Sequence, residues 1–200
     1  YIKISLFINR IMDISYNYEK IKSYLTYSKQ NSEYELEALF IDSNKITTEK
    51  FKEIFKYFSE SLDFELSSKQ NNETLDIRIV SNKQLEKYRL SIIDKNDIKL
   101  YCKSNKYNSN NIFYGIKQNL NKFPPINLNN YPIKFNLKLD TELNDIDEKK
   151  KIDNNIEKEK KYFRFKKRFS FISKSKLFTI DLSLVKSSKK KYSTTFYESG

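Results

Sequence analysis

The feature that most constrains the fold of this chain is a regular alternation of apolar and charged residues in several of its segments. In residues 162–172, YFRFKKRFSFI, phenylalanines alternate with Arg164, Lys166 and Arg168. Successive side chains of a β-strand point to opposite faces of the sheet, so this spacing predicts a strand with one apolar and one cationic face.

Three further segments have the same period, and two of them are also basic. Residues 177–185, LFTIDLSLV, follow a short turn and are expected to form the hairpin partner of that strand, with Asp181 and Ser183 on the polar face. The other two polar faces carry Arg78 in residues 74–81, and Lys134 and Lys138 in residues 131–140.

Residues 33–40, EYELEALF, differ because their polar face is acidic. Alternation places Glu33, Glu35 and Glu37 together opposite an apolar face. Like charges this close repel one another unless water, a basic side chain or a metal ion lies between them. Glu35 and Glu37 offer the hard oxygen ligands that Mg²⁺ and Mn²⁺ prefer, and the ordinary alternative is an exposed strand edge without a metal.

The remaining segments give a coarser prediction. Apolar residues at helical spacing predict helices over residues 13–29 and 46–61. We expect strands at 64–69 and 97–103. The charged stretch 141–160 is expected to be a solvated loop, with partial helix as the alternative.

These patterns together predict the fold class. Rows of like charge are costly on a solvent-facing sheet, but opposed rows can offset one another inside a closed, water-filled barrel. We therefore expect an α+β fold, mainly antiparallel β, with a barrel whose apolar faces pack against helices; a two-sheet sandwich is the alternative. Carboxylates opposed to rows of Arg and Lys are the arrangement that a metal-bound phosphate chain requires.

Composition restricts the chemistry. The chain has 200 residues, 38% of them hydrophobic and 15% aromatic, which indicates a folded domain. Its net charge of +12 favours a polyanionic partner, although a general abundance of lysine would produce the same value. The absence of histidine excludes Ser-His triads and His-ligated zinc, and the single Cys102 indicates a reducing, intracellular compartment.

Other function classes are excluded by what the sequence lacks. The only glycines are Gly115 and Gly200, so a Gly-rich phosphate loop is absent. No apolar run of about 18 residues is present, so no membrane span is expected.

The order of the segments resembles that of the triphosphate tunnel metalloenzymes, in particular the RNA 5′-triphosphatase domain of mRNA capping enzymes from large DNA viruses. The matching segments begin near residue 33 and are YELEALF, TLDIRIVS, YPIKFNLKLD, YFRFKKRFSF, LFTIDLSLVKSS and YSTTFYESG. The resemblance implies a triphosphate-tunnel-like antiparallel β-barrel with flanking helices. It also implies removal of the γ-phosphate from nascent viral RNA, the first step of mRNA capping.

The resemblance also implies roles for individual residues. Glu35 and Glu37 would be the ligands of Mg²⁺ or Mn²⁺, and Glu33 lies outside that pair. The positions implied to be catalytic are Arg164, Lys166, Arg168, Asp181 and Ser183. The positions implied to bind substrate are Arg78, Lys134 and Lys138.

The chain departs from the family at several points. Leu39 stands where a basic residue usually follows the glutamate pair, and Thr179 stands where one often precedes the aspartate. A second E-x-E strand is expected after YSTTFYESG. The prediction is therefore a C-terminally truncated tunnel domain over 33–200, lacking its last strand or strands, after a helical segment over 1–32. Such a fragment would be impaired alone and active within its parent.

The resemblance implies the 5′-triphosphate end of RNA as partner, with guanylyltransferase and methyltransferase domains in the same parent chain. The implied location is the viral factory in the host cytoplasm, or the virion. Two alternatives stay open: a tunnel-family phosphohydrolase acting on small triphosphates, and a non-catalytic basic RNA-binding β domain.

Overall fold

The structure is a computed structural model, and it forms two compact units. It describes residues 17–40, 46–67, 73–80, 85–107, 111–128 and 131–189. The smaller unit comprises residues 1–45 and 116–141, and the larger unit comprises residues 46–115 and 142–200. Parts of the predicted segments 1–32, 64–69 and 74–81, and all of YSTTFYESG, lie outside the described residues.

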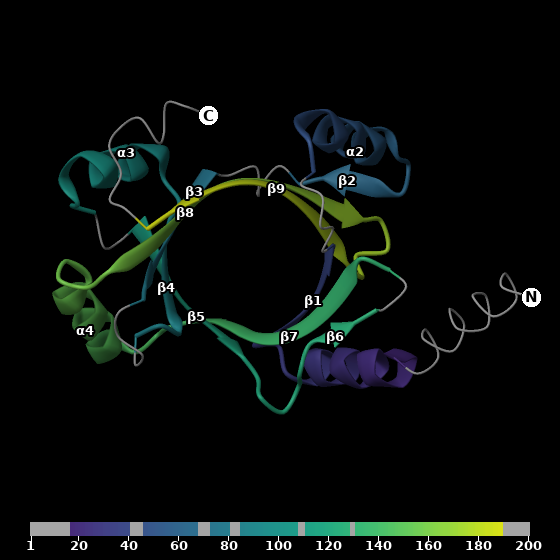
Figure 1. The fold of residues 1–200 in the computed structure, drawn as a ribbon, viewed down its shortest axis with the longest axis horizontal. Coiled ribbons are helices and arrows are strands. Elements are labelled where there is room, and N and C mark those ends of the chain that lie inside the picture. The colour runs from purple at the N-terminus through teal and green to yellow at the C-terminus, as the bar shows by residue number, and fades with distance from the viewer. Residues whose placement is uncertain are drawn as a thin grey trace, which may run out of the picture. The chain divides into compact units, whose positions relative to one another are not determined.

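Nine strands of the described chain are hydrogen-bonded in the order β1-β7-β5-β4-β3-β8-β2, with β6 beside β7 and β9 beside β8 (Figure 1). Every strand pair with a described register is antiparallel, as predicted. Among the described residues this path ends at β1 and at β2, so the sheet is not closed. The predicted fold class, mainly antiparallel β with flanking helices, is confirmed. The strands of the sheet are β1 Tyr34–Phe40, β2 Phe64–Leu66, β3 Glu73–Ile79, β4 Tyr88–Ile92, β5 Ile112–Asn119, β6 Ile126–Asn127, β7 Ile133–Glu142, β8 Lys161–Ser173 and β9 Thr179–Ser188.

The smaller unit packs a helix over residues 17–30 against the apolar face of β1 and β7 (Figure 1). Its buried centre is formed by Tyr24, Ile126 and Leu137. The Tyr24 hydroxyl donates a hydrogen bond to the Pro124 carbonyl oxygen at 2.8 Å, which fixes the helix to the loop before β6. The apolar side chains are thus covered, and the polar face of β1 and β7 is left for charged residues.

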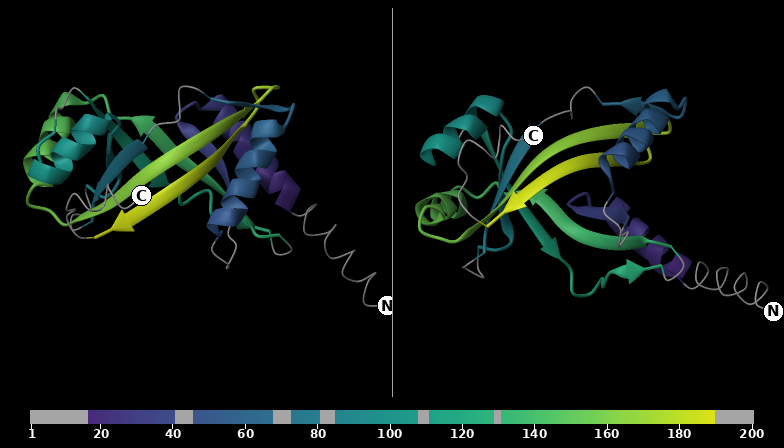
Figure 2. Two further views of the ribbon diagram at one scale, coloured as in Figure 1. Left: turned by 90° about the horizontal axis from the view of Figure 1, so that it is seen from above. Right: turned by 45° about the horizontal axis from the view of Figure 1, so that its top comes forward.

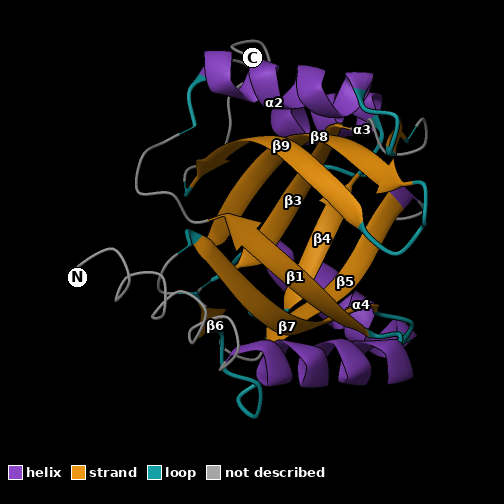
Figure 3. Cartoon of the chain, turned by 90° about the vertical axis from the view of Figure 1, so that its right-hand side faces the viewer, coloured by secondary structure: helices purple, strands orange, loops and turns teal. Residues whose placement is uncertain are grey.

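In the larger unit, β8 and β9 form the predicted long hairpin (Figure 2). The aromatic face of β8 is covered by α2, where the ring of Phe55 lies 5.1 Å from that of Phe169 and 5.6 Å from that of Phe171 (Figure 3). Phe171 is fully buried. The opposite face of the hairpin carries the basic side chains. The helices are α2 Thr48–Glu60, α3 Lys95–Ser104 and α4 Ile146–Ile156.

The helix predicted over 46–61 is confirmed as α2, and its N-cap is Thr47, whose side chain accepts a hydrogen bond from the Lys50 amide. The strand predicted at 97–103 is wrong, because these residues belong to α3. Ile98, Tyr101 and Cys102 are its buried residues, and their spacing of three and four residues is that of a helix.

For the charged stretch 141–160 the partly helical alternative is confirmed, because its central part forms α4. Ile152 and Ile156 are 0% and 3% exposed, so one apolar stripe docks an otherwise charged helix. The Asp153 carboxylate also accepts hydrogen bonds from the hydroxyls of Tyr107 and Tyr114, both at 2.7 Å. Among the described residues, no helix is long and apolar enough to cross a lipid bilayer.

Candidate active site

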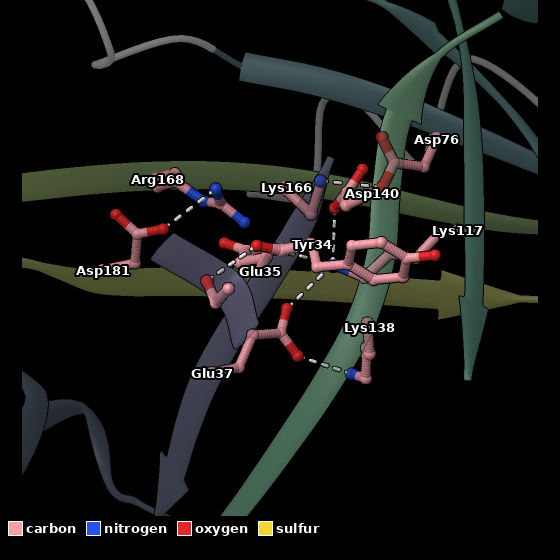
Figure 4. A network of polar contacts seen from close by, with 11 residues as sticks. Tyr34, Glu35, Glu37, Asp76, Lys117, Lys138, Asp140, Lys166, Arg168 and Asp181 are labelled. Atoms are coloured by element: carbon pink, nitrogen blue, oxygen red, sulfur yellow. Dashed lines mark hydrogen bonds and ion pairs between the residues drawn. The ribbon is translucent and has the colours of Figure 1, made fainter. Parts of the chain in front are cut away.

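The polar face of the smaller unit contains an acidic cluster, formed by Glu35 and Glu37 on β1 and Asp140 on β7 (Figure 4). Lys117 on β5 contacts all three: its Nζ lies 2.7 Å from Asp140 Oδ2, 2.8 Å from Glu37 Oε1 and 3.4 Å from Glu35 Oε2. Lys138 pairs with the second oxygen of Glu37. An ammonium group therefore lies among the three carboxylates.

The electrostatics of the cluster differ between its two glutamates. Desolvation raises the pKa of Glu35; the Lys117 charge opposes the rise, and the neighbouring carboxylates reinforce it. Burial also acts to raise the pKa of Glu37, but hydrogen bonds from Lys117 and Lys138 outweigh it, so that the pKa is lowered. Burial acts to lower the pKa of Lys117, yet its hydrogen bonds to Asp140 and Glu37 raise it overall. Of the two glutamates, Glu35 is therefore the one whose ionised form is stabilised less by Lys117 and Lys138.

The donor set of the cluster suits a hard divalent cation. Within the described ranges, no group of three or more His, Cys, Asp and Glu side chains is arranged around a single metal position. Mg²⁺ commonly binds through one or two carboxylates, and takes its other oxygens from water and substrate phosphates. Glu35 and Glu37 fit that requirement, since both already contact one cation, the Lys117 ammonium.

The polar face of the larger unit is cationic. Strand register places Arg78 opposite Arg89, and Asp76 opposite Arg164. Alternation along β8 adds Lys166 and Arg168 to the same face. We call these side chains the cationic face; its described members are Arg78, Arg89, Arg164, Lys166 and Arg168. This face also carries the carboxylates of Asp76 and Asp181.

Asp76 fixes the centre of the cationic face and is only 3% exposed. It accepts an ion pair from Lys166 Nζ at 2.7 Å and a hydrogen bond from Ser91 Oγ at 2.8 Å. Burial lowers the pKa of Lys166 below its ordinary value; Asp76 opposes this, and the charges of Arg168 and Arg89 add to it. Lys166 therefore lies where positive charge is in excess and where an anion would be stabilised.

Asp181 on β9 orients the outer end of the cationic face. Its Oδ2 lies 2.9 Å from Arg168 Nη1 (Figure 4). Its Oδ1 accepts a hydrogen bond from Ser170 Oγ at 2.6 Å. Ser183 lies directly opposite Arg168 in the hairpin register and is half-buried. The hairpin therefore positions one guanidinium group through its neighbouring strand.

Arg89 lies close to a glycine in the neighbouring strand. A Cβ placed on Gly115 of β5 would come within 3.4 Å of Arg89 Nη2 and 2.9 Å of Phe113 Cε1. The missing side chain leaves space that the Arg89 guanidinium occupies. Gly115 thus has a packing role at the cationic face.

Within each unit, the structure places the predicted site residues on the expected polar faces. In the smaller unit Glu35, Glu37 and Lys138 form one network, and Lys134 lies on the same face opposite Leu39. Glu33 lies in the turn before β1, outside the network. The predicted members in the larger unit are Arg78, Arg164, Lys166, Arg168, Asp181 and Ser183.

Sequence reasoning missed four residues that complete these networks: Asp76, Arg89, Lys117 and Asp140. Asp76 and Asp140 lie on the polar faces of predicted strands, so their alternation was a usable signal. Arg89 and Lys117 lie on strands that were not predicted, although YRLSI alternates in the same way.

The fold of the chain is similar to that of solved structures of a viral RNA triphosphatase domain. The solved structures are of the RNA triphosphatase domain of the trifunctional mimivirus mRNA capping enzyme. One of these structures is 20% identical in sequence to this chain, and the two superpose with a TM-score of 0.62; the match covers 88% of this chain and 80% of the mimivirus chain. A triclinic and a monoclinic structure of the mimivirus capping enzyme triphosphatase are 18% and 19% identical, with TM-scores of 0.62 and 0.60.

The matches to the triclinic and monoclinic structures cover 88% and 86% of this chain, and each covers 80% of the mimivirus chain. Neither a protein-family model nor a curated protein matches the chain. The predicted resemblance to the triphosphatase domains of viral capping enzymes is therefore confirmed at the level of the fold.

Proposed function

We propose that the chain is an RNA 5′-triphosphatase that removes the γ-phosphate of nascent viral RNA, the first step of mRNA capping. The observation that carries the proposal is the cationic face, where Asp76 and Asp181 position Lys166 and Arg168 on a sheet with a triphosphatase fold. In the reaction, water attacks the γ-phosphorus and the bond to the β-phosphate oxygen breaks. The products are RNA with a 5′-diphosphate end and inorganic phosphate.

The cationic face supplies the contacts to phosphate in this proposal. The planar guanidinium groups of Arg168 and Arg164 can each donate two hydrogen bonds to one phosphate, and Lys166 adds a compact charge. Asp181 holds Arg168, and Asp76 holds Lys166, so the donors are oriented before substrate binds. Arg78 and Arg89 extend the charge toward the neighbouring phosphates.

The acidic cluster supplies the cation site and the base. Mg²⁺ or Mn²⁺, bound by Glu35 and Glu37, would polarise the phosphate oxygens and neutralise charge that develops on them. The chain has no histidine, and in this proposal a carboxylate of the cluster accepts the proton of the attacking water. Lys134 and Lys138, on the same strand as Asp140, would contribute further positive charge for the phosphate chain.

The test is release of γ-phosphate from RNA that carries a labelled 5′-triphosphate, with Mg²⁺ or Mn²⁺, by the chain within its full parent protein. The Glu35→Ala/Glu37→Ala variant is expected to lose metal-dependent phosphate release. Lys166→Met is expected to release phosphate at least about tenfold more slowly than the wild type. Exposed Lys150→Met on α4 is the matched control for loss of one lysine charge. Release unchanged by the double glutamate variant would refute the assignment.

The same assay separates the proposal from the two alternatives. A phosphohydrolase for small triphosphates would cleave inorganic triphosphate or ATP and leave the RNA end intact. An RNA-binding module would bind RNA equally with a 5′-triphosphate or a 5′-hydroxyl end and release no phosphate.

The proposal extends to partners and location. The mimivirus structure belongs to a trifunctional capping enzyme, which supports further capping domains, a guanylyltransferase and a methyltransferase, in the parent of this chain. The viral factory of the host cytoplasm, or the virion, is where nascent viral RNA would present its 5′ end.

A further inference from the structure

Lys117 Nζ lies among the three carboxylates of the acidic cluster. It contacts one oxygen from each of Glu35, Glu37 and Asp140, within 3.4 Å in every case. Lys138, in contrast, contacts Glu37 alone among these carboxylates. Both oxygens of Glu37 are therefore bound by ammonium groups.

A second cation at Glu37 would meet an ammonium group at either carboxylate oxygen. A divalent ion held by Glu35 and Glu37 needs oxygen atoms at about 2.0–2.1 Å if it is Mg²⁺, and the Lys117 ammonium would then repel it at contact distance. The side chains of Lys117 and Glu37 are 16% and 20% exposed, so water screens the competition little at Glu37, whereas the Glu35 side chain is 53% exposed.

We propose that Lys117 is a built-in competitor of the metal: it neutralises the acidic cluster when no metal is bound, and a divalent cation binds only by displacing it. The inference rests on the proposed function, because it concerns the cation site of that reaction. It assigns to Lys117 a positioning and regulatory role that lowers metal affinity and keeps the carboxylates in place without metal.

The geometry favours displacement of Lys117 from the glutamates without its loss from the cluster. Asp140 lies on β7 and its contact with Lys117 is the shortest of the three, at 2.7 Å. A lysine side chain has a flexible four-carbon stem, so Nζ can keep Asp140 while it leaves Glu35 and Glu37. The weak 3.4 Å contact to Glu35 is the first that we expect to be lost.

The experiment is direct measurement of Mn²⁺ binding, by titration calorimetry and by the electron paramagnetic resonance signal of free Mn²⁺, on the full chain without RNA. Lys117→Met is expected to bind Mn²⁺ at least about tenfold more tightly than the wild type, because metal no longer displaces an ion pair. Lys117→Arg, which keeps the charge, is expected to bind no more tightly than the wild type.

Lys134→Met is the matched control. Lys134 lies on β7 on the same face, and forms no ion pair with the cluster among the described residues. Its loss removes the same charge from the same unit, so we expect an affinity within about twofold of the wild type. An equal gain in both methionine variants would overturn the competition and would indicate a general effect of charge.

Thermal unfolding gives a second readout if Lys117→Met folds poorly. Without metal this variant is expected to melt below the wild type, and Mn²⁺ is expected to raise its melting temperature more than that of the wild type. If Mn²⁺ does not raise the melting temperature of Lys117→Met more than that of the wild type, the inference is overturned.

The outcomes separate the inference from the proposed function. Equal Mn²⁺ affinity in the wild type and Lys117→Met overturns the competition alone and leaves the metal-dependent reaction standing. Absence of Mn²⁺ binding in every variant, together with phosphate release that needs no metal, overturns the metal site and the inference together.

Discussion

The Asp76–Lys166 ion pair at the centre of the cationic face gives the sharpest stability prediction. Asp76→Asn keeps the shape of the side chain and an oxygen that can accept from Ser91 Oγ. It removes the negative charge that lies 2.7 Å from Lys166 Nζ. The Lys166 ammonium would then have no carboxylate in a site that also receives the charge of Arg89 and Arg168.

The expected loss follows from the burial of the pair. The side chains of Asp76 and Lys166 are 4% and 13% exposed. Breaking a fully buried pair costs about 3–5 kcal/mol, and a hydrogen bond to a charged group contributes about 1.5–3 kcal/mol. Since Lys166 keeps some access to water, we expect the free energy of unfolding to fall by about 2–3 kcal/mol at neutral pH.

The pH dependence gives the variant a distinctive signature. The pKa of Lys166 is already lowered in the folded protein, and loss of Asp76 lowers it further. A lysine whose pKa is lower when folded binds fewer protons in the folded state than in the unfolded state, so stability rises with pH through that interval. The loss in Asp76→Asn is therefore expected to shrink as the pH rises above neutral.

The assay is urea unfolding followed by far-ultraviolet circular dichroism, over a series of pH values. Asp181→Asn is the matched control on the same face; because Asp181 and Arg168 are 38% and 44% exposed, it should cost at most about 1 kcal/mol. Lys166→Met in the Asp76→Asn background should recover part of the loss. Equal losses for the two Asn variants, or a loss that grows with pH, would refute the reasoning.

Two further predictions concern the neighbouring groups. Gly115→Ala is expected to lower the free energy of unfolding by about 1 kcal/mol and to weaken binding of triphosphate-ended RNA, because its Cβ would meet Phe113 and Arg89. Urea unfolding and RNA titration measure the two effects, and an unchanged RNA affinity would contradict the packing role. Glu37→Gln should lower the free energy of unfolding by about 1–2 kcal/mol at neutral pH, because the pKa of Glu37 is lower in the folded state; this stabilisation is present above the unfolded-state pKa and is lost as the pH falls through the folded-state pKa. Glu35→Gln should leave stability equal or higher, since the pKa of Glu35 is raised. Unfolding at neutral and acidic pH would refute this if the two variants changed alike.

The sequence predicted the strands whose two faces differ most in polarity. β1, β3, β7, β8 and β9 alternate because one face is covered by apolar packing and the other is charged, and this contrast is local in the sequence. Prediction was incomplete where a short apolar stripe on a charged segment decides the structure. α3 and α4 each depend on two or three buried side chains, which are few against the surrounding charge.

The candidate site was predicted in part for a related reason. Glu35, Glu37 and the basic residues of β8 form recognisable local patterns. Lys117 is separated from Glu37 by 80 residues, and only the pairing of strands brings the two together. A lysine that neutralises a carboxylate pair from another strand cannot be distinguished in the sequence from any other surface lysine.

The central claim is that the cationic face binds a terminal triphosphate, and the most direct measurement compares RNA of one sequence with two different ends. At about 0.15 M salt, where long-range charge is screened, we predict at least about tenfold tighter binding of the 5′-triphosphate end than of the 5′-hydroxyl end. Lys166→Met should reduce that preference. Equal affinity for both ends would contradict the claim.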